Sequence, residues 1–310
     1  MNRSIASKVA FISLILLPLL LMPLPMRAFA TPFDAARVPA DADGVGHLDM
    51  DALRATTLHR LVTPKVLNGS QWKEIDARAR PLAHTLLDVA QGVTFWLADR
   101  DSGALIVQVP DGKRIQSLLD KVPHKGDVRV AGHVARRYHF SKEKDQGDDN
   151  LIAMAGNLLI SADSEANLAR AINAATGKAR NLAATHSVPD AALERGVFFF
   201  TALNDRLLDK VKDAAQSKTL RLNMTGLTVH VREVSAELRV RAKLMMGSAE
   251  QANKIKSMVD GVLALASVSD EADQLRPLTK GFALSVNGKA LELSLAIPSA
   301  ELVHFIETHN

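Results

Sequence analysis

The sequence contains no cysteine, which excludes disulfide bonds, thiolate metal sites and a cysteine nucleophile. Aromatic residues are also scarce, with one tyrosine and two tryptophans among 310 residues. The motifs Gly-x-Ser-x-Gly, the P-loop and the dinucleotide fingerprint are missing as well. Catalytic groups can assemble from distant residues, so these absences make an enzyme less expected without excluding one.

The N-terminus has the composition of an export signal. A basic segment, 2–8, precedes an apolar run, 9–26, and Ala28-Phe29-Ala30 supplies small residues at the two positions that a signal peptidase reads. Three prolines in the run disfavour a continuous spanning helix. We therefore predict a signal peptide over residues 1–30, cleaved after Ala30. An uncleaved membrane anchor is the alternative, because the apolar run approaches the length that a bilayer requires.

The predicted cleavage changes the charge of the chain. The whole sequence has 38 Lys and Arg against 34 Asp and Glu. The signal peptide removes Arg3, Lys8 and Arg27 and no acid, which leaves 35 basic against 34 acidic residues, a net charge of +1. Nucleic acid is therefore not a predicted partner, since the basic excess belongs largely to the signal peptide.

A degenerate internal repeat organises the remaining chain. Gly92–Leu97 (GVTFWL) returns as Gly226–Val231 (GLTVHV), and Ile115–Val122 returns as Ile255–Val262. Alternating strands and amphipathic helices follow in the same order in each half. We predict an α+β fold of two similar domains from an internal duplication, each an antiparallel-leaning sheet covered on one face by helices. The predicted boundaries are an irregular lead-in at 31–43, a first repeat at 44–176, a linker at 177–195 and a second repeat at 196–310.

Four local expectations are specific enough to check. Asp51 is placed to cap a helix over 52–62. A second helix is expected over 72–89, which Pro81 bends or splits in two. Residues 128–140 have the alternation of one strand. Asn287-Gly288 predicts a tight hairpin turn.

The histidines and acids do not have metal-ligand spacing. His133 and His139 would lie about 20 Å apart on a strand, which is too far for one ion. His304, Glu307 and His309 lack the i,i+4 pattern of a zincin helix and lie at the terminus. Asp145 to Asn150 lacks EF-hand spacing and is typical of a solvated turn. We predict no metal and no cofactor.

Two acidic pairs could suggest acid catalysis. Asp49 and Asp51 form one pair, and Asp99 and Asp101 form the other. Each has a local explanation as a helix cap or a turn residue. Catalytic residues therefore stay unassigned.

Two sets of residues are candidates for a ligand or partner surface. Phe95, Trp96 and Phe199 occupy matched strands and are expected in the core, or lining an apolar pocket between the domains. Arg129, Arg136 and Arg137 form the densest basic group, but acids beside them favour a solvated face of mixed charge. Trp96 and His230, which the repeat aligns, are expected to differ in burial.

The leading hypothesis is an exported, non-enzymatic protein that binds a protein or an apolar ligand in the cell envelope, with the cleft between the repeats as its surface. The repeat resembles duplicated proteins exported to bacterial envelopes, and a periplasmic or secreted location is expected. One alternative is an envelope hydrolase whose site is assembled from Asp, Ser and His of both halves. Another is a membrane-tethered structural module. The oligomeric state stays open.

Overall fold

The structure is a computed structural model that describes residues 31–67, 79–98, 102–138, 149–185, 192, 194–204, 224–267 and 279–309. The strands are β1 (Gly44–Asp49), β2 (Gly92–Leu97), β3 (Gly103–Gln108), β4 (Asp127–Val130), β5 (His133–Tyr138), β6 (Asn150–Ala155), β7 (Leu158–Ala162), β8 (Phe198–Ala202), β9 (Met224–Val234), β10 (Glu237–Met246), β11 (Phe282–Asn287) and β12 (Ala290–Pro298). The helices are α2 (Met50–Arg54), α3 (Thr57–Leu67), α5 (Arg80–Val89), α6 (Gly112–Leu119), α7 (Glu165–Ala175), α10 (Ala249–Ser267) and α12 (Ser299–His309), with 3-10 turns η1 (Ala35–Arg37) and η2 (Ala183–Thr185).

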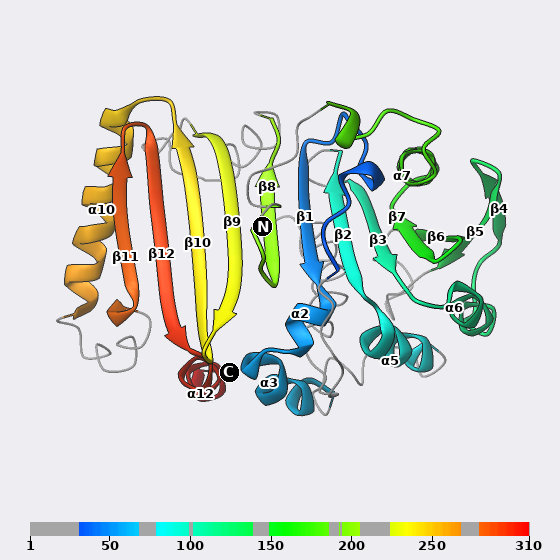
Figure 1. The fold of residues 1–310 in the computed structure, drawn as a ribbon, viewed down its shortest axis with the longest axis horizontal. Coiled ribbons are helices and arrows are strands. Elements are labelled where there is room, and N and C mark those ends of the chain that lie inside the picture. Colours follow the sequence, from blue (N-terminus) through cyan, green and yellow to red (C-terminus); the bar gives the residue numbers. More distant parts are fainter. Residues whose placement is uncertain are drawn as a thin grey trace.

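The described strands form one twelve-stranded antiparallel sheet (Figure 1). Its order is β11-β12-β10-β9-β8-β1-β2-β3-β7-β6-β5-β4. The predicted α+β class and antiparallel sheet are therefore confirmed. A division into two separate sheets is not, because β1 and β8 pair at the centre, with Leu48 opposite Phe198 and Gly44 opposite Ala202.

The strand order is nevertheless the same in both directions from the centre. Outward from β1 it runs β1-β2-β3-β7-β6, and outward from β8 it runs β8-β9-β10-β12-β11. Strands β4 and β5 extend only the first direction. We call β1–β7 the first half of the sheet and β8–β12 the second half.

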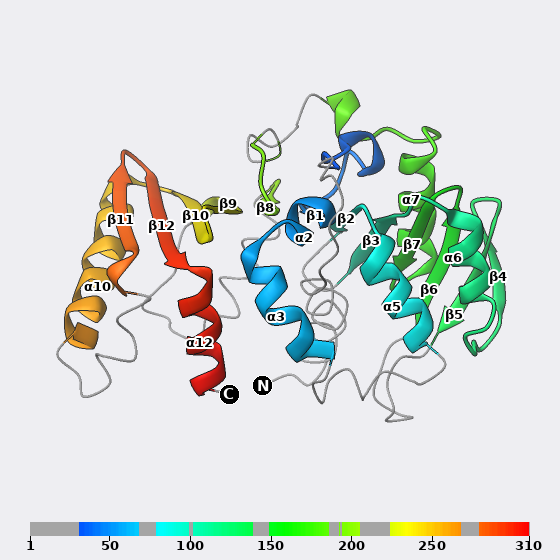
Figure 2. The same cartoon turned by 60° about the horizontal axis from the view of Figure 1, so that its bottom comes forward.

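Helices cover the two halves differently (Figure 2). We call the face toward α7 the upper face and the opposite face the lower face. In the first half, α7 and η1 cover the upper face around Trp96, and α5 and α6 cover the lower face around Val93. In the second half, the described helices α10 and α12 lie only below the sheet. The expectation of helices on one face therefore holds for the second half alone.

Two element predictions are corrected. Residues 128–140 were expected to form one strand, but β4 and β5 make a hairpin, because Ala131 and Gly132 adopt φ of 48° and 87° and reverse the chain. The first helix is capped by Asp49, not Asp51: Asp49 Oδ1 accepts the Ala52 N–H at 2.8 Å.

Other local expectations are met or fall outside the described residues. The hairpin over Asn287-Gly288 is present, with Gly288 at φ 57°. Within the helix expected over 72–89, Arg80–Val89 is helical with Pro81 in its first turn, where proline is tolerated. Residues 72–78 and the acidic segment 145–148 lie outside the described part of the chain.

The lead-in and the linker candidate pack against each other. Pro39 forms a β-bridge with Asn181, and the Leu182 N–H donates to the Val38 carbonyl at 3.0 Å. Val38 and Leu182 are both buried. The lead-in is thus an ordered strap across the upper face and includes the turn η1.

Candidate functional site

The predicted aromatic residues do not line one pocket. Phe95 lies on the lower face, stacked between Phe198 and Phe200 with ring centroids 6.3 and 6.0 Å away. Trp96 and Phe199 lie on the upper face and are both buried in its core. Because β1 pairs directly with both β2 and β8, a continuous sheet occupies the junction where an apolar cleft was expected.

Trp96 and His230 do not differ in burial, so that expectation is wrong. Their exposed fractions are 0% and 5%. Trp96 lies under the guanidinium of Arg170, 4.7 Å from the ring centroid. His230 Nδ1 lies 3.7 Å from the Glu194 carboxylate, and burial lowers its pKa. Residues at corresponding repeat positions are therefore both interior, but with different partners.

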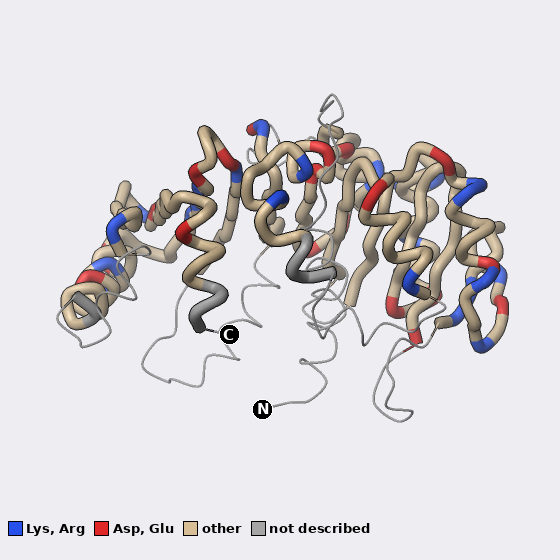
Figure 3. Tube along the Cα trace, turned by 90° about the horizontal axis from the view of Figure 1, so that it is seen from below, with Lys and Arg blue, Asp and Glu red and all other residues tan. Residues whose placement is uncertain are grey.

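The predicted basic group is divided by the sheet. Arg129 and Arg136 project from the side that carries Val134, whereas Arg137 projects from the other side and pairs with Glu165 at 3.3 Å. Arg129 is exposed. Basic and acidic segments alternate at this end of the molecule (Figure 3). This arrangement matches the mixed-charge surface expected from the sequence.

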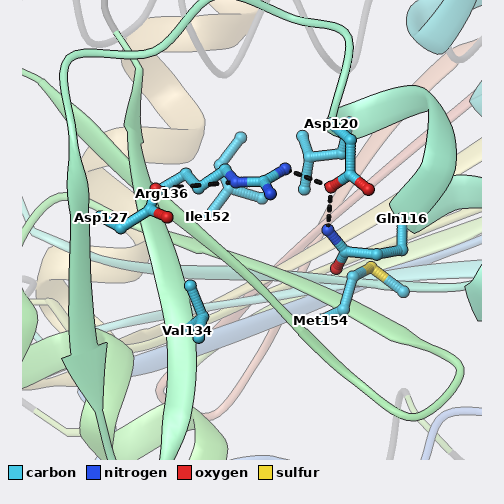
Figure 4. Close-up of a pocket in the computed structure, with 8 residues that line it drawn as sticks. Gln116, Asp120, Asp127, Val134, Arg136, Ile152 and Met154 are labelled. Carbon is cyan, nitrogen blue, oxygen red and sulfur yellow. Dashed lines mark hydrogen bonds and ion pairs between the residues drawn. The ribbon is translucent and has the colours of Figure 1, made fainter.

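Arg136 belongs to a cavity of about 470 Å³ between α6 and the strands β4, β5 and β6 (Figure 4). Its guanidinium forms an ion pair with Asp120 and lies 3.7 Å from Asp127. Gln116 Nε2 donates to the same Asp120 oxygen at 2.6 Å. Apolar side chains complete the lining: Leu119, Val134, Ile152 and Met154.

The chemistry of this cavity favours a structural role. The hydrogen bonds from Gln116 and Arg136 hold the pKa of Asp120 below its usual range, so the carboxyl stays ionised and cannot act as a general acid near neutral pH. The Arg136 charge is matched by Asp120 and Asp127. The described lining holds no histidine, and Asp120 is an acid with a lowered pKa, so the cavity does not offer the proton donor that a hydrolase needs.

Burial lowers the pKa of two described histidines to about 4: His47 on the central strand β1 and His59 in α3. His47 is 6% exposed. Its Nε2 lies 3.0 Å from the Thr31 carbonyl, which can only accept, so Nε2 carries the proton. Nδ1 then accepts from the Thr94 hydroxyl at 2.9 Å. Neutral His47 thus has both ring nitrogens paired.

Acids and one arginine adjoin His47. Burial raises the pKa of Asp49, which caps α2. Arg54 NH1 donates to Asp51 at 2.9 Å, and its NH2 donates to the carbonyls of Leu87 and Ala90 at 2.8 and 2.6 Å. These contacts hold α2 against the end of α5. None of the contacts above joins a hydroxyl, a histidine and an acid in series, as a catalytic triad requires.

The metal-ligand candidates are not brought together in the described residues. Within that part of the chain there is no group of three or more His, Asp or Glu side chains that could hold an ion. His133 Nδ1 lies 3.1 Å from the Met154 carbonyl. His139, Asp99 and Asp101 lie outside the described residues, as do the side chains of Glu307 and His309.

The candidate functional site is the apolar lower face of the second half. Directly paired residues share a face of the sheet, and alternate residues along a strand do too. In β9 to β12 the lower face is made by Leu227, Val229, Val231, Val240, Ala242, Leu244, Leu291, Leu293, Leu295, Phe282, Leu284 and Val286. Of these, Leu291 is buried and the others are only partly buried.

Helix α10 covers this face incompletely and exposes apolar residues of its own. Ile255 packs against the small cluster around Ala252 and Met246. Met258, Val262 and Leu265, which we call the α10 stripe, are 49%, 65% and 71% exposed. Their i, i+4, i+7 spacing places them on one side of the helix. Large apolar side chains at this exposure mark interaction surfaces when they cluster.

The sequence contained a signal for the α10 stripe. Apolar residues recur around more than one side of the helix over 249–266, which is more than one buried face needs. The repeat drew attention to strand residues instead, and neither the stripe nor the lower face was among the predicted surfaces.

Comparisons with known proteins give a fold and no activity. No protein-family model matches the chain, and no curated protein matches it. Crystal form I of TP0453 has a TM-score of 0.50 at 11% identity, covering 90% of this chain and 98% of that one. Crystal form III has a TM-score of 0.52 at 10% identity, covering 91% and 100%. At such identity the likeness shows a shared fold alone.

Proposed function

We propose that this chain is an exported, non-enzymatic binding protein that holds an apolar partner against the lower face of its second half. The observation that carries the proposal is the α10 stripe, three large apolar side chains that are 49%, 65% and 71% exposed. The partner is an apolar ligand or the apolar surface of an envelope protein. This site replaces the cleft expected between the repeats.

The incomplete packing of the second half supports a binding role. The lower face of β9–β12 is apolar along its length, yet most of its side chains remain partly exposed. Burying apolar surface is worth about 25 cal/mol per Å², so a partner that covers this face and the stripe gains affinity from contacts that the described fold leaves unmade.

The hydrolase alternative receives less support. A hydrolase needs perturbed acids or histidines at an accessible site, whereas His47 and Asp49 are buried and already partnered. The membrane-tethered module depends on residues 1–30, which lie outside the described part of the chain; within that part, no helix is long and apolar enough to cross a bilayer. We retain the signal peptide over 1–30, a periplasmic or secreted location and the internal duplication as parts of the proposal. The mirrored strand order supports the duplication.

The test is to purify the protein from its native envelope and identify co-purifying lipids and proteins by mass spectrometry. In parallel, an apolar fluorescent probe, 1-anilinonaphthalene-8-sulfonate, is titrated against the purified protein. We expect bound probe or co-purified material with wild type and a loss of at least several-fold for Met258→Gln/Val262→Gln, because amides on the stripe resist burial.

A matched control changes the polar side of the same helix. Asn253→Gln/Asp260→Gln alters two exposed residues on the side of α10 opposite the stripe and should bind as wild type does. Lipid in the purified complex identifies an apolar ligand, and a stoichiometric polypeptide identifies a protein partner. Equal binding by the stripe variant and the control would contradict the proposal.

A further inference from the structure

Thr31 is held by contacts from several elements. Its carbonyl lies 3.0 Å from His47 Nε2, and its hydroxyl donates to Asp51 Oδ2 at 3.2 Å. Its backbone N–H donates to the Asp49 carboxylate. Every polar group of this residue is therefore bound by the region where β1 ends and α2 begins.

The sheet also leaves space for the side chain of Thr31. A Cβ atom placed on Gly92 would lie 2.9 Å from His47 Cε1 and 3.3 Å from Thr31 Cγ2. Glycine at this position of β2 thus lets the imidazole and the threonine methyl approach the strand. The next aromatic residue, Phe33, packs edge-on against Phe199, with ring centroids 5.1 Å apart. The segment 31–33 therefore packs against the sheet from Thr31 onward.

Among the described residues, the charges around Thr31 do not balance. Asp49 and Asp51 supply two carboxylates at this point, and Arg54 supplies one cation, which binds Asp51. Arg37, the other cation whose charge acts on His47, is paired with Asp34. His47 adds no positive charge at neutral pH, because its buried ring has a pKa of about 4. Asp49 is 6% exposed and is bound by backbone N–H groups. A second cation at the Thr31 nitrogen would neutralise the cluster.

Residue 31 is also the residue that follows the predicted cleavage site. The Ala28-Phe29-Ala30 motif was assigned from sequence alone, and the contacts of Thr31 come from the fold alone. We propose that Asp49, Asp51 and His47 form a binding site for the new amino terminus that signal-peptidase cleavage creates at Thr31. The inference rests on the export part of the proposed function and is independent of apolar binding.

The cleavage changes the Thr31 nitrogen from an amide to an amine and leaves its position beside Asp49 unchanged. Water hydrolyses the Ala30–Thr31 peptide bond, its oxygen stays on the Ala30 carboxylate, and the Thr31 nitrogen becomes an amine that takes up a proton at neutral pH. The nitrogen that donated to Asp49 as an amide then donates as an ammonium. Charge-assisted hydrogen bonds of this kind are about twice as strong as neutral ones. Removal of the signal peptide would thus tighten the strap onto the sheet.

The experiment uses the full chain, exported and purified from the envelope. N-terminal sequencing should give Thr31. Acylation of the α-amine at pH 7 by a succinimidyl ester, followed by mass spectrometry, should be at least about tenfold slower in the folded protein than in urea, because a bound ammonium is a poor nucleophile. The Asp49→Asn variant, which keeps a capping side chain, should recover much of that rate.

An insertion separates binding of the terminus from ordinary packing. Gly-Ser inserted between Ala30 and Thr31 moves the ammonium away from the two acids and leaves residues 31 onward unchanged. We expect the Tm to fall by about 3 °C, in keeping with one lost charged hydrogen bond in a chain of this length. In the Asp49→Asn/Asp51→Asn background the same insertion should lower the Tm by less than about 1 °C, because the charges it disrupts are gone.

Three results would overturn the inference. They are a mature terminus other than Thr31, equal acylation rates in the folded and unfolded protein, or an insertion that lowers the Tm equally in both backgrounds. A terminus at another residue also removes the predicted cleavage site but leaves the test of apolar binding intact. Loss of apolar binding, in turn, has no bearing on the terminus.

Discussion

The two halves of the sheet share a strand order but differ in what covers them. Across the upper face, one row of directly paired residues begins at Trp96 and Val45 in the first half and continues as Thr201, Thr228 and Lys243 in the second. The row is buried where it is apolar and partly or fully exposed where it is polar. Helices therefore cover the upper face where the strand side chains are apolar, although the strand order is the same in both halves.

The two halves also differ in how far the lower face of the sheet is buried. This face is apolar in both halves, yet the first half has a core of fully buried residues there, such as Leu53 and Ile115. In the second half, the described residues form only a small cluster near Met246. The first half is thus a closed three-layer structure, and the second is a sheet whose apolar side remains partly open. Stability should reside in the first half and binding in the second.

The comparison predicts unequal costs for matched core truncations. Ile172→Ala removes a fully buried side chain of α7 and should cost about 2–5 kcal/mol of unfolding free energy. Leu295→Ala, which removes the same number of carbons from the partly exposed lower face of β12, should cost about 1 kcal/mol or less, because water already reaches the site. Urea unfolding of both variants measures the difference. Equal losses would show that the halves are equally closed.

The first half should also respond to acid through His47. Its pKa is about 4 in the folded protein and 6.5 in the unfolded chain, so the unfolded chain binds more protons between these values. Stability is then full above pH 6.5 and falls by about 3 kcal/mol as the pH drops to 4. His47→Gln, which can still donate to Thr31 and accept from Thr94, should flatten this part of the curve. An unchanged pH slope would contradict the assignment.

The sequence predicted features that depend on neighbouring residues and missed features that depend on contacts between distant segments of the chain. The alternation of the strands and the hairpin turn at Asn287-Gly288 follow from neighbouring residues, so they could be assigned. The pairing of β1 with β8 joins residues about 150 positions apart, and no local period encodes it. The mixed-charge surface could be read from composition. The excess of apolar residues in α10 could be read from the sequence as well, but the exposure of the α10 stripe could not, because it depends on which helices lie beside it.

The Glu233 side chain adds a link between the halves beside the pairing of β1 with β8, and its loss should weaken their junction. Glu233 of β9 accepts hydrogen bonds from the N–H groups of Thr57 and Leu58 in α3, at 2.5 and 2.9 Å, and from the Ser299 hydroxyl in α12 at 2.6 Å. Glu233→Ala should cost about 1–2 kcal/mol, the value of a lost helix cap. The exposed Glu237→Ala, whose partner is Arg239, should stay within about 0.5 kcal/mol of wild type.

The contribution of Glu233 to stability should depend on pH, and the direction follows from its pKa. Burial alone would raise the pKa of Glu233, but the hydrogen bonds from Ser299, Thr57 and Leu58 outweigh it and hold the pKa below its usual value. The contribution is therefore complete above about pH 4.5 and is lost as the pH falls through the lower, folded value. Wild type and Glu233→Ala should converge in stability under acid. If the stability difference between wild type and Glu233→Ala persists in acid, the packing of the Glu233 side chain, and not its charge, accounts for this link.

The smallest expected effect is the one that separates binding from stability. Met258 and Val262 are exposed, so Met258→Gln/Val262→Gln removes little buried surface and should change the unfolding free energy by less than about 0.5 kcal/mol. A natural core face would lose several times more from the same two changes. If thermal unfolding shows a large loss, the α10 stripe is part of the core in solution and the second half is as closed as the first. If stability is kept while the apolar probe no longer binds, the open side of the second half is a surface retained for a partner.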